Sequence, residues 1–227
     1  MNKVSNIDSY KTIIFDCDGV ILNSNKVKTE AFYNTALQFG KAAAERLVKY
    51  HIERGGISRY EKFQWFIDSL TEDDLAQSES EPNLDSLLAT YASEVHKGLR
   101  SCEIAEGLAE LRNKTEASTW LIVSGGDQAE LRELFTERNI AQYFDGGIFG
   151  SPDTKETILK RELDNKNLTL PAVFIGDSKY DYTASKSIKG IHFIFVHKWS
   201  EVEDWESFCN FNHIPHLTSI KGLLLSN

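Results

Sequence analysis

Tyr10-Lys-Thr-Ile-Ile-Phe15, followed at once by Asp16-Cys-Asp-Gly19, is the stretch that decides the fold of this sequence. Its first part is a β-branched and aromatic run, which is typical of a buried strand. The acidic segment ends that strand, and Gly19 permits a tight turn. Because residues i and i+2 of an extended segment project to the same side, Asp16 and Asp18 are predicted to point into one pocket. Like charges so close repel each other, and a divalent cation would relieve that repulsion.

Other apolar runs along the chain predict strands of the same kind. They cover residues 120–123, 172–175 and 192–196, with a weaker candidate at 147–150. Near-continuous apolar runs suit parallel strands that are covered on both faces. Helical patterns lie between them, and strands alternating with helices predict a doubly wound, parallel α/β sheet. In such a sheet, ligands bind at the carboxyl ends of the strands.

The interval from about Ser24 to about Arg100 breaks this alternation, because it holds only helical patterns and loops. It is too long for a single crossover connection. We therefore predict a Rossmann-like core from residues 1–23 and 101–227, with a smaller α-helical cap inserted over residues 24–100. Within the cap, the acidic run at 72–82 is expected to be a solvated connector.

Overall charge and cysteine content exclude several classes of partner. The chain has 227 residues and a formal net charge of -9, so it lacks the basic surface that binding to nucleic acid or an anionic membrane requires. It contains no run of about 18 apolar residues that could span a bilayer, and no signal-peptide core. Its cysteines form no CxxC pair, and an odd number suits no disulfide framework. We expect a cytoplasmic protein with reduced thiols, either a monomer or a weak homodimer, that binds no nucleic acid and no membrane.

Two further segments place polar groups where an anion could bind. Ser124-Gly-Gly126 follows a buried strand, where small residues let backbone N–H groups approach an oxyanion and the Ser124 hydroxyl adds a donor. Lys155 is predicted near a helix start, with Lys160 as the alternative if the register differs. The candidate caps of that helix are Ser151, Asp153 and Thr154, and Pro152 suits a first helical position.

Asp177 and Asp181 follow the most hydrophobic predicted strand. One lies at the strand end and the other about a helical turn further on, so both can reach a pocket above the sheet. Ligand sets made only of oxygen suit Mg²⁺, which also keeps waters and a substrate phosphate.

In order and context, these four segments resemble the motifs of the haloacid dehalogenase superfamily, in the branch of phosphoglycolate phosphatases and β-phosphoglucomutases with a helical cap. The resemblance covers the whole chain. It implies that Asp16 attacks phosphorus and forms an aspartyl phosphate, while Asp18 protonates the leaving oxygen and then activates water. It also implies that Ser124 and Lys155, beside Gly125 and Gly126, hold the phosphoryl oxygens. The implied Mg²⁺ ligands are Asp16, the backbone carbonyl of Asp18 and Asp177, with Asp181 supporting directly or through water.

Two positions depart from the family pattern. Asn23 stands where the family often has an acid, and Glu156 follows Lys155 where the family often has proline. The carboxylate at Asp18 favours phosphate esters, since family dehalogenases lack an acid/base there and phosphonate hydrolases carry a small residue.

Gly55-Gly-Ile-Ser-Arg-Tyr-Glu-Lys62 resembles the cap loop of β-phosphoglucomutase-like relatives, in which an arginine meets a second anionic group of the substrate. The resemblance implies that Arg59, with Lys62, reads a distal phosphate or carboxylate, and the fork of arginine suits such a role. The alternative is that Ser58 caps a helix and these charges are solvated.

The sequence therefore predicts a Mg²⁺-dependent phosphatase that acts on a small phosphorylated metabolite, either a sugar phosphate or a phospho-acid. The main alternative is a phosphosugar mutase, against which Lys28 counts because the mutase has a cap-hinge histidine there. A non-catalytic binding protein is less favoured because all the chemical groups are present. A receiver-type signalling module would be much shorter and would lack the insert. A cysteine phosphatase would need an arginine six residues after its cysteine, but Asn23 stands six residues after Cys17.

Overall fold

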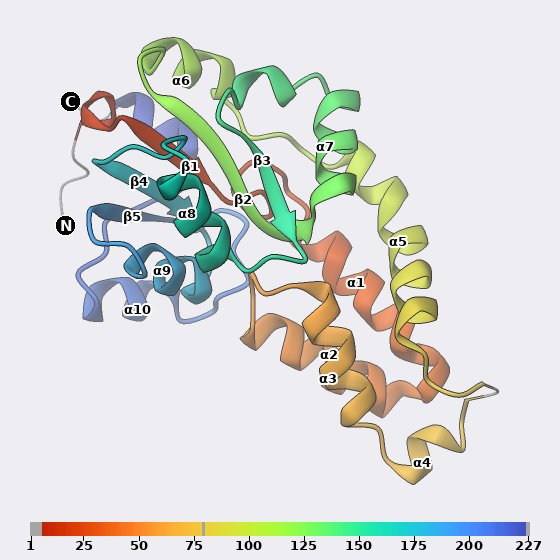
Figure 1. The fold of residues 1–227 in the computed structure, drawn as a ribbon. Coiled ribbons are helices and arrows are strands. Elements are labelled where there is room, and N and C mark those ends of the chain that lie inside the picture. Colours follow the sequence, from red (N-terminus) through yellow and green to blue (C-terminus); the bar gives the residue numbers. More distant parts are fainter. Residues whose placement is uncertain (1–5, 79, 226–227) are drawn as a thin grey trace.

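The computed structural model describes residues 6–78 and 80–225, and these form an α/β core with a helical bundle beside it (Figure 1). Six parallel strands build one sheet in the order β3-β2-β1-β4-β5-β6. This confirms the predicted doubly wound α/β class. The strands are β1 (Thr12–Phe15), β2 (Thr119–Asp127), β3 (Gly147–Ser151), β4 (Ala172–Gly176), β5 (Ile191–Val196) and β6 (His216–Leu217).

Strand order reverses between β1 and β4, because β2 and β3 follow on one side of β1 while β5 and β6 follow on the other. Phe15 at the end of β1 lies level with Ile175 near the end of β4. Loops that leave these two strand ends diverge, which opens a crevice at the carboxyl edge of the sheet.

Both faces of the sheet are covered, which explains the continuous apolar runs. Ile13 and Phe15 of β1 belong to one buried cluster and Ile14 to another, as expected for side chains that alternate across a strand. The first face packs against α6 (Leu108–Lys114) and α7 (Gln128–Glu137), and the second against α8 (Lys155–Asp164), α9 (Lys179–Lys186) and α10 (Trp205–Phe211).

The sixth strand was not predicted. His216 and Leu217 pair with β5, where their partners are Phe195 and Val196. Two residues that follow a proline carry no periodic pattern, so only the neighbouring strand reveals this pairing.

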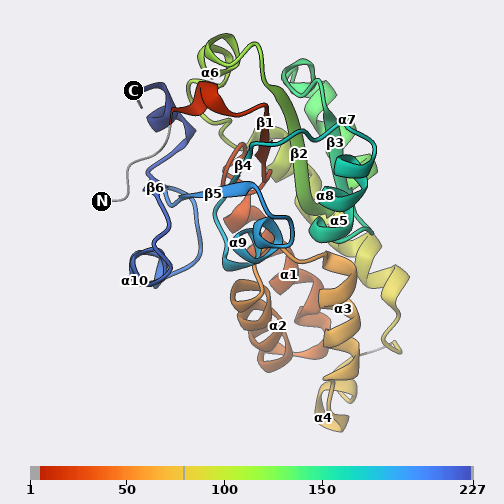
Figure 2. The same cartoon turned by 60° about the vertical axis from the view of Figure 1, so that its left-hand side comes forward.

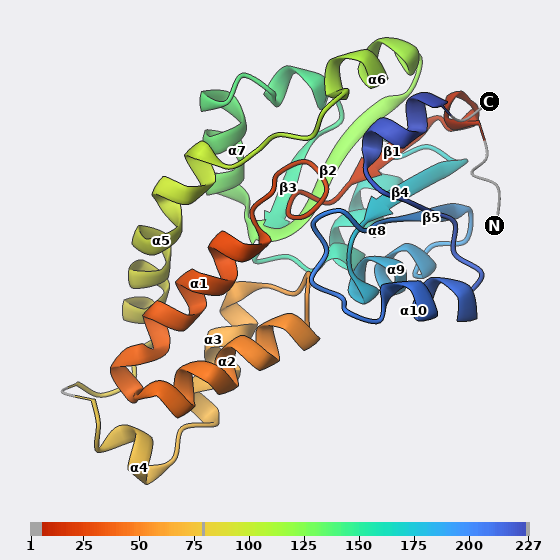
Figure 3. The same ribbon diagram turned by 180° about the vertical axis from the view of Figure 1, so that it is seen from behind.

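The helical bundle has a separate apolar core and lies beyond one end of the sheet (Figures 2 and 3). Phe32, Phe63, Phe66 and Tyr91 are among its buried aromatic residues. Its helices are α1 (Asn25–Ala36), α2 (Lys41–Glu53), α3 (Arg59–Asp68), α4 (Glu72–Leu75) and α5 (Leu84–Ser101). Short 3-10 helices occur at Ile7–Ser9, Leu37–Phe39, Ala141–Tyr143 and Ile220–Leu225.

The described residues of the acidic run at 72–82 are mostly exposed, as expected of a solvated connector, but the run begins with a helix. Its first residues form α4, and Thr71 and Asp74 make a capping box there. Asp74 is buried and accepts a 2.5 Å hydrogen bond from Arg46 of α2. A partner from a distant helix therefore offsets the buried charge, which the local sequence does not reveal. Within the described ranges, no helix is long and apolar enough to cross a membrane.

Candidate active site

Three buried carboxylates gather where β1 and β4 end. Asp16 directly follows β1, Asp177 directly follows β4, and Asp181 lies in the first turn of α9. Each offers one carboxylate oxygen, and these oxygens all lie within 4.8 Å of one another. The strand register causes this meeting, since the Asp16 amide donates a 3.0 Å hydrogen bond to the carbonyl of Ile175 on β4.

Asp181 is held rigidly by its own helix start. Its Oδ2 accepts hydrogen bonds from the amides of Asp177 and Ser178 at 3.2 and 3.1 Å, and from the Ser178 hydroxyl at 2.7 Å. Its Oδ1 accepts a 2.5 Å hydrogen bond from Lys155 Nζ. Ser178 caps the helix and Asp181 completes a capping box, so one sequence pattern builds both the helix start and the acidic site.

Lys155 is the cation of this cluster. It is the first residue of α8, Thr154 provides the cap, and Pro152 lies before the helix. The side chain is 1% exposed, and Nζ lies 2.9 Å from Asp16 Oδ1. Burial alone would lower the pKa of Lys155, but the carboxylates of Asp16 and Asp181 raise it further, so this lysine stays charged. Lys160, the alternative, is exposed on the same helix.

The charge balance of the cluster fits a divalent cation. When ionised, the three carboxylates carry three negative charges against one on Lys155, so two negative charges remain. Burial raises the pKa of Asp16 to about 7 despite Lys155, and burial with the nearby acids raises the pKa of Asp177 well above its usual range. Asp16 Oδ1 is buried, and Lys155 Nζ at 2.9 Å is an ion-pair partner that lacks the angles of a hydrogen bond. A buried cluster of carboxylate oxygens that keeps two negative charges beside one lysine is suited to Mg²⁺.

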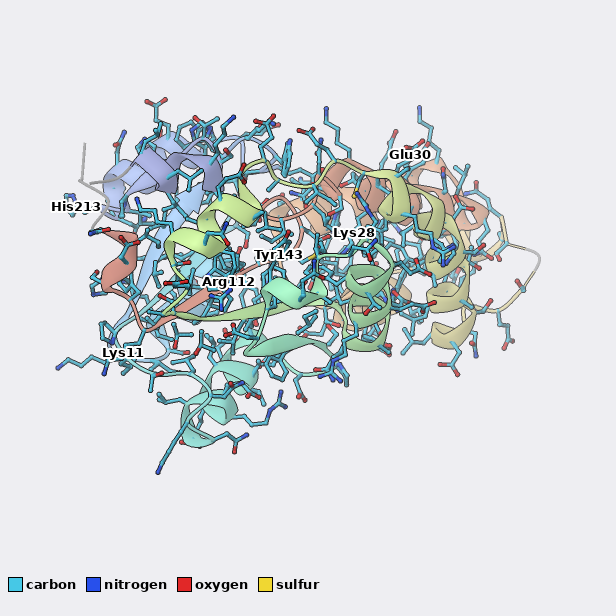
Figure 4. All side chains as sticks on the ribbon, turned by 90° about the horizontal axis from the view of Figure 1, so that it is seen from above. Lys11, Lys28, Glu30, Arg112, Tyr143 and His213 are labelled. Carbon is cyan, nitrogen blue, oxygen red and sulfur yellow. The ribbon has the colours of Figure 1, made fainter. Side chains whose placement is uncertain are left out.

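Asp18 lines the same cavity as Asp16 but has different partners. Its carboxylate accepts hydrogen bonds from Ser24 Oγ at 2.6 Å and from Lys28 Nζ at 2.5 Å. Burial raises the pKa of Asp18, but Lys28 and these two hydrogen bonds outweigh it and the net shift is downward. Lys28 belongs to α1 and lies where the bundle meets the core (Figure 4). Sequence reasoning used Lys28 only against a mutase and missed this ion pair.

The Ser124-Gly-Gly126 segment forms a neighbouring wall. Ser124 is fully buried, and its Oγ accepts a 3.0 Å hydrogen bond from the Gly126 amide, while both glycines line the cavity. A Cβ added at Gly125 would lie 2.3 Å from the carbonyl oxygen of Gly56. Glycine is therefore required at position 125 because the loop before α3 approaches the core closely there.

A cavity lies between the sheet edge and the bundle. Of the acidic residues described above, Asp16, Asp18 and Asp177 line it, while Lys155 and Asp181 lie behind them. The bundle contributes its other wall, and the structure brings both predicted cap residues, Arg59 and Lys62, into it. Residues lining it include Asp16, Asp18, Asp177, Gly125, Gly126, Lys28, Phe32, His51, Arg59, Lys62, Tyr91, Glu130 and Glu201.

Arg59 and Lys62 have different surroundings in that cavity. Arg59 donates two 2.7 Å hydrogen bonds to Glu130 of α7, which leaves its Nη atoms committed to the core. Lys62 is buried in α3 and lies 2.6 Å from His51 Nδ1. Ser58 caps α3, as the alternative interpretation expected, yet neither charge is solvated.

Sequence reasoning missed several residues that complete the site. Asn25 donates a 2.7 Å hydrogen bond to Asp177, and Tyr60 donates a 2.8 Å hydrogen bond to Asp127. Such partners are far apart in the chain, so no short motif signals them.

Comparison with known proteins agrees with this geometry. The family model described as "Haloacid dehalogenase-like hydrolase" matches residues 13–196. Comparison with curated proteins found no match. The chain therefore belongs to the haloacid dehalogenase-like hydrolase family, and it is a hydrolytic enzyme with the fold of that family.

Solved structures with this fold span nearly the whole chain. A predicted phosphatase from Clostridium acetobutylicum has a TM-score of 0.67 at 16% identity, covering 94% of this chain and 96% of that one. CbbY from Rhodobacter sphaeroides, solved in complex with phosphate, has the same TM-score of 0.67, identity of 16% and coverage of 94% and 96%. A predicted phosphoglycolate phosphatase from Haemophilus somnus has a TM-score of 0.59 at 17% identity, covering 82% and 85%. At these identities the likeness concerns the fold alone.

Proposed function

We propose that the protein is a Mg²⁺-dependent phosphatase that hydrolyses a small phosphorylated metabolite through an aspartyl phosphate on Asp16. The observation that carries this proposal is the buried cluster of Asp16, Asp177 and Asp181 with Lys155, at a cavity wall that also presents Asp18. Phosphoryl transfer depends mainly on positioning and on neutralising charge, and this cluster supplies both.

Each residue has a role that its surroundings support. Asp16 is the nucleophile, because its carboxylate lines the cavity at the end of β1 and has Lys155 beside it. Asp18, oriented by Ser24 and Lys28, would in its protonated form give a proton to the leaving oxygen, and the resulting carboxylate would then take one from water. Lys155 would hold a phosphoryl oxygen.

The Ser124 segment would bind the remaining phosphoryl oxygens. Ser124 Oγ already accepts from the Gly126 amide, so its own O–H is left to donate to an oxyanion. The amide of Gly125 adjoins it on the cavity wall. Donors that are fixed before substrate arrives need no reorganisation during the reaction.

Mg²⁺ would be held by Asp16, the Asp18 carbonyl and Asp177, with Asp181 supporting directly or through water. When bound, such a cation neutralises negative charge on the phosphoryl group. The protein's share is to keep these oxygens buried and close together.

Mg²⁺ is expected to stabilise the folded protein, because the cation offsets mutual repulsion of buried carboxylates. At about 100 times its Kd, Mg²⁺ should add about 2.7 kcal/mol to the free energy of unfolding, or roughly 5–10 °C in Tm. Differential scanning fluorimetry with and without Mg²⁺ measures this shift. Asp177→Asn should abolish it, whereas Asp85→Asn, at an exposed residue of α5, should keep it. An equal shift in both variants would contradict this metal site.

Arg59 is expected to act on substrate binding by holding the bundle against the core, since its guanidinium is bound by Glu130. Closure that excludes water is a common gate in enzymes with a cap. Arg59→Ala and Glu130→Ala should each lower kcat/KM by about tenfold, or ~1.4 kcal/mol, and the double variant by little more than either. A loss confined to Arg59→Ala would instead show that Arg59 reads the substrate directly.

The proposal is tested by measuring inorganic phosphate release from phosphorylated sugars and small phospho-acids, with Mg²⁺ and with EDTA. Release that needs the metal supports it. Isomerised sugar phosphates without phosphate release would identify a mutase instead, and an inactive protein would support a binding role.

Cellular compartment and assembly stay predictions. Cys17, Cys102 and Cys209 are all free, which agrees with the cytoplasm expected from the sequence. We keep the expectation of a monomer or weak homodimer with no nucleic-acid or membrane partner.

A further inference from the structure

Lys62 is a buried cation for which the proposed chemistry gives no complete explanation. Its exposed fraction is 3%, and it lines the cavity from α3. Among the described residues, its Nζ hydrogen-bonds only His51 Nδ1, at 2.6 Å, and no carboxylate lies within ion-pair distance. A buried ammonium with one neutral acceptor is costly unless an anion joins it.

The other cap cations of the cavity already have carboxylate partners. Lys28 Nζ lies 2.5 Å from Asp18, and Arg59 lies 2.7 Å from Glu130. Within the described part of the cavity wall, Lys62 is therefore the lysine or arginine whose charge is not paired. One positive charge is left for a ligand.

Hydrogen bonds beyond His51 fix how Lys62 is presented. Thr29 Oγ1 donates to Glu201 at 2.7 Å, which uses its only hydrogen. Thr29 Oγ1 must then accept from His51 Nε2–H, 3.1 Å away, so His51 Nδ1 carries the lone pair that accepts from Lys62. Lys62 thus donates one N–H to a neutral imidazole, and its other N–H groups can donate to a ligand.

An apolar part of the cavity wall suits a short carbon chain. Lys62 Nζ lies 5.4 Å from the centroid of Phe32, and Ile52, Tyr91 and Val95 line the cavity with it. These side chains offer few partners for sugar hydroxyls. Glu201 also lines this wall, and its negative charge opposes a second phosphate more strongly than a single carboxylate.

We propose that Lys62 binds a carboxylate of the substrate, so that the substrate is a short phosphorylated carboxylic acid with its phosphoryl group at Asp16. This inference rests on the proposed phosphatase function and chooses between its two substrate classes. One ammonium matches one carboxylate in charge, whereas an uncharged sugar would leave Lys62 unpaired and a second phosphate would exceed it.

The test compares two matched series of phosphate monoesters. One series is made from straight-chain hydroxy acids of increasing length, and the other from diols of the same lengths, which replace the carboxylate by a hydroxymethyl group. Hexose phosphates complete the panel. The best acid should exceed its matched diol in kcat/KM by about 10- to 100-fold, the range of a hydrogen-bonded charge pair.

Lys62→Met should collapse that ratio to within about threefold of unity, since methionine keeps the volume but not the charge. Lys49→Met removes an exposed lysine from the same bundle and should keep the wild-type ratio. Thermal unfolding should show that both variants are folded. Replacing buried Lys62 by methionine removes an unpaired charge, so we expect no loss of stability.

The ratio should also depend on pH. Burial lowers the pKa of Lys62 to about 7; Lys28 and Lys155 lower it as well, and Asp18 and Glu201 raise it. His51, whose pKa lies well below its usual range, stays neutral. Because lysine is charged below its pKa, the acid-to-diol ratio should be largest below pH 7 and fall as pH rises through it. In Lys62→Met the acid-to-diol ratio should not change with pH. Effects of pH on catalysis that are common to both series cancel in this ratio.

Two outcomes would overturn the inference while leaving the phosphatase intact: diol or hexose phosphates hydrolysed as well as the acids, or an acid preference that survives in Lys62→Met. If no monoester in the panel is hydrolysed with Mg²⁺, the proposed function fails and the inference fails with it.

Discussion

Asp16→Asn should reduce kcat for phosphate release by on the order of 10⁴-fold or more, as expected when a covalent nucleophile is removed. The amide cannot attack phosphorus, although it matches the carboxylate in size. Asp16 is buried at the end of β1, and asparagine keeps the backbone hydrogen bond that aligns β1 with β4. The loss should therefore be chemical and not a loss of folding.

Steady-state phosphate release with Mg²⁺ at saturating substrate measures this effect. Asp85→Asn is the matched control, because Asp85 is exposed in the helical bundle. Thermal unfolding should show that Asp16→Asn is folded. Retained activity within about tenfold of wild type would contradict a role for Asp16 as nucleophile.

Lys155→Met should lower kcat/KM by about 10²- to 10³-fold, the range found when one preorganised hydrogen-bond donor to a developing negative charge is removed. Lys155 Nζ contacts both Asp16 and Asp181, and with a 1% exposed side chain it acts where water screens poorly. Methionine has a similar length but leaves the phosphoryl group without its cation.

Lys160→Met is the control for this variant, since Lys160 is exposed on the same helix. Its activity should match the wild type. Unfolding of Lys155→Met should be followed with Mg²⁺ present, because the carboxylates lose their lysine partner. Equal losses of kcat/KM in both variants would contradict a specific role for Lys155 and would leave Lys160 as a candidate for that role.

The acidic cluster was predictable because each member lies in a locally defined position. Asp16 follows an apolar strand, Asp181 completes a capping box, and Lys155 begins a helix after Thr154. Strand, cap and helix signals are local, and parallel strands bring their carboxyl ends together whatever the rest of the sequence does.

Contacts between the bundle and the core were not predictable in the same way. Arg59 and Glu130 are 71 positions apart in the chain, and no sequence motif that contains one of them predicts a contact with the other. Lys62 was predicted to read a substrate anion together with Arg59, but nothing in the sequence distinguishes a paired arginine from an unpaired lysine. That difference depends on where α7 lies against α3.

These observations assign different tasks to the two parts of the protein. In the proposed function, the carboxylates of the core would hold the cation that neutralises the phosphoryl group together with Lys155. The bundle closes the cavity and supplies Lys28 to Asp18. Changes in the bundle should therefore alter substrate choice more than the capacity for phosphoryl transfer.

The most direct measurement is to quench the enzyme with acid during turnover with Mg²⁺ and map any covalent phosphoryl group by mass spectrometry. Asp18→Asn should raise its yield, since hydrolysis of the intermediate would lack its base. The account predicts a phosphoryl group on Asp16, present only while substrate remains and absent in Asp16→Asn. A phosphoryl group on another residue, or phosphate release that persists in Asp16→Asn, would contradict it.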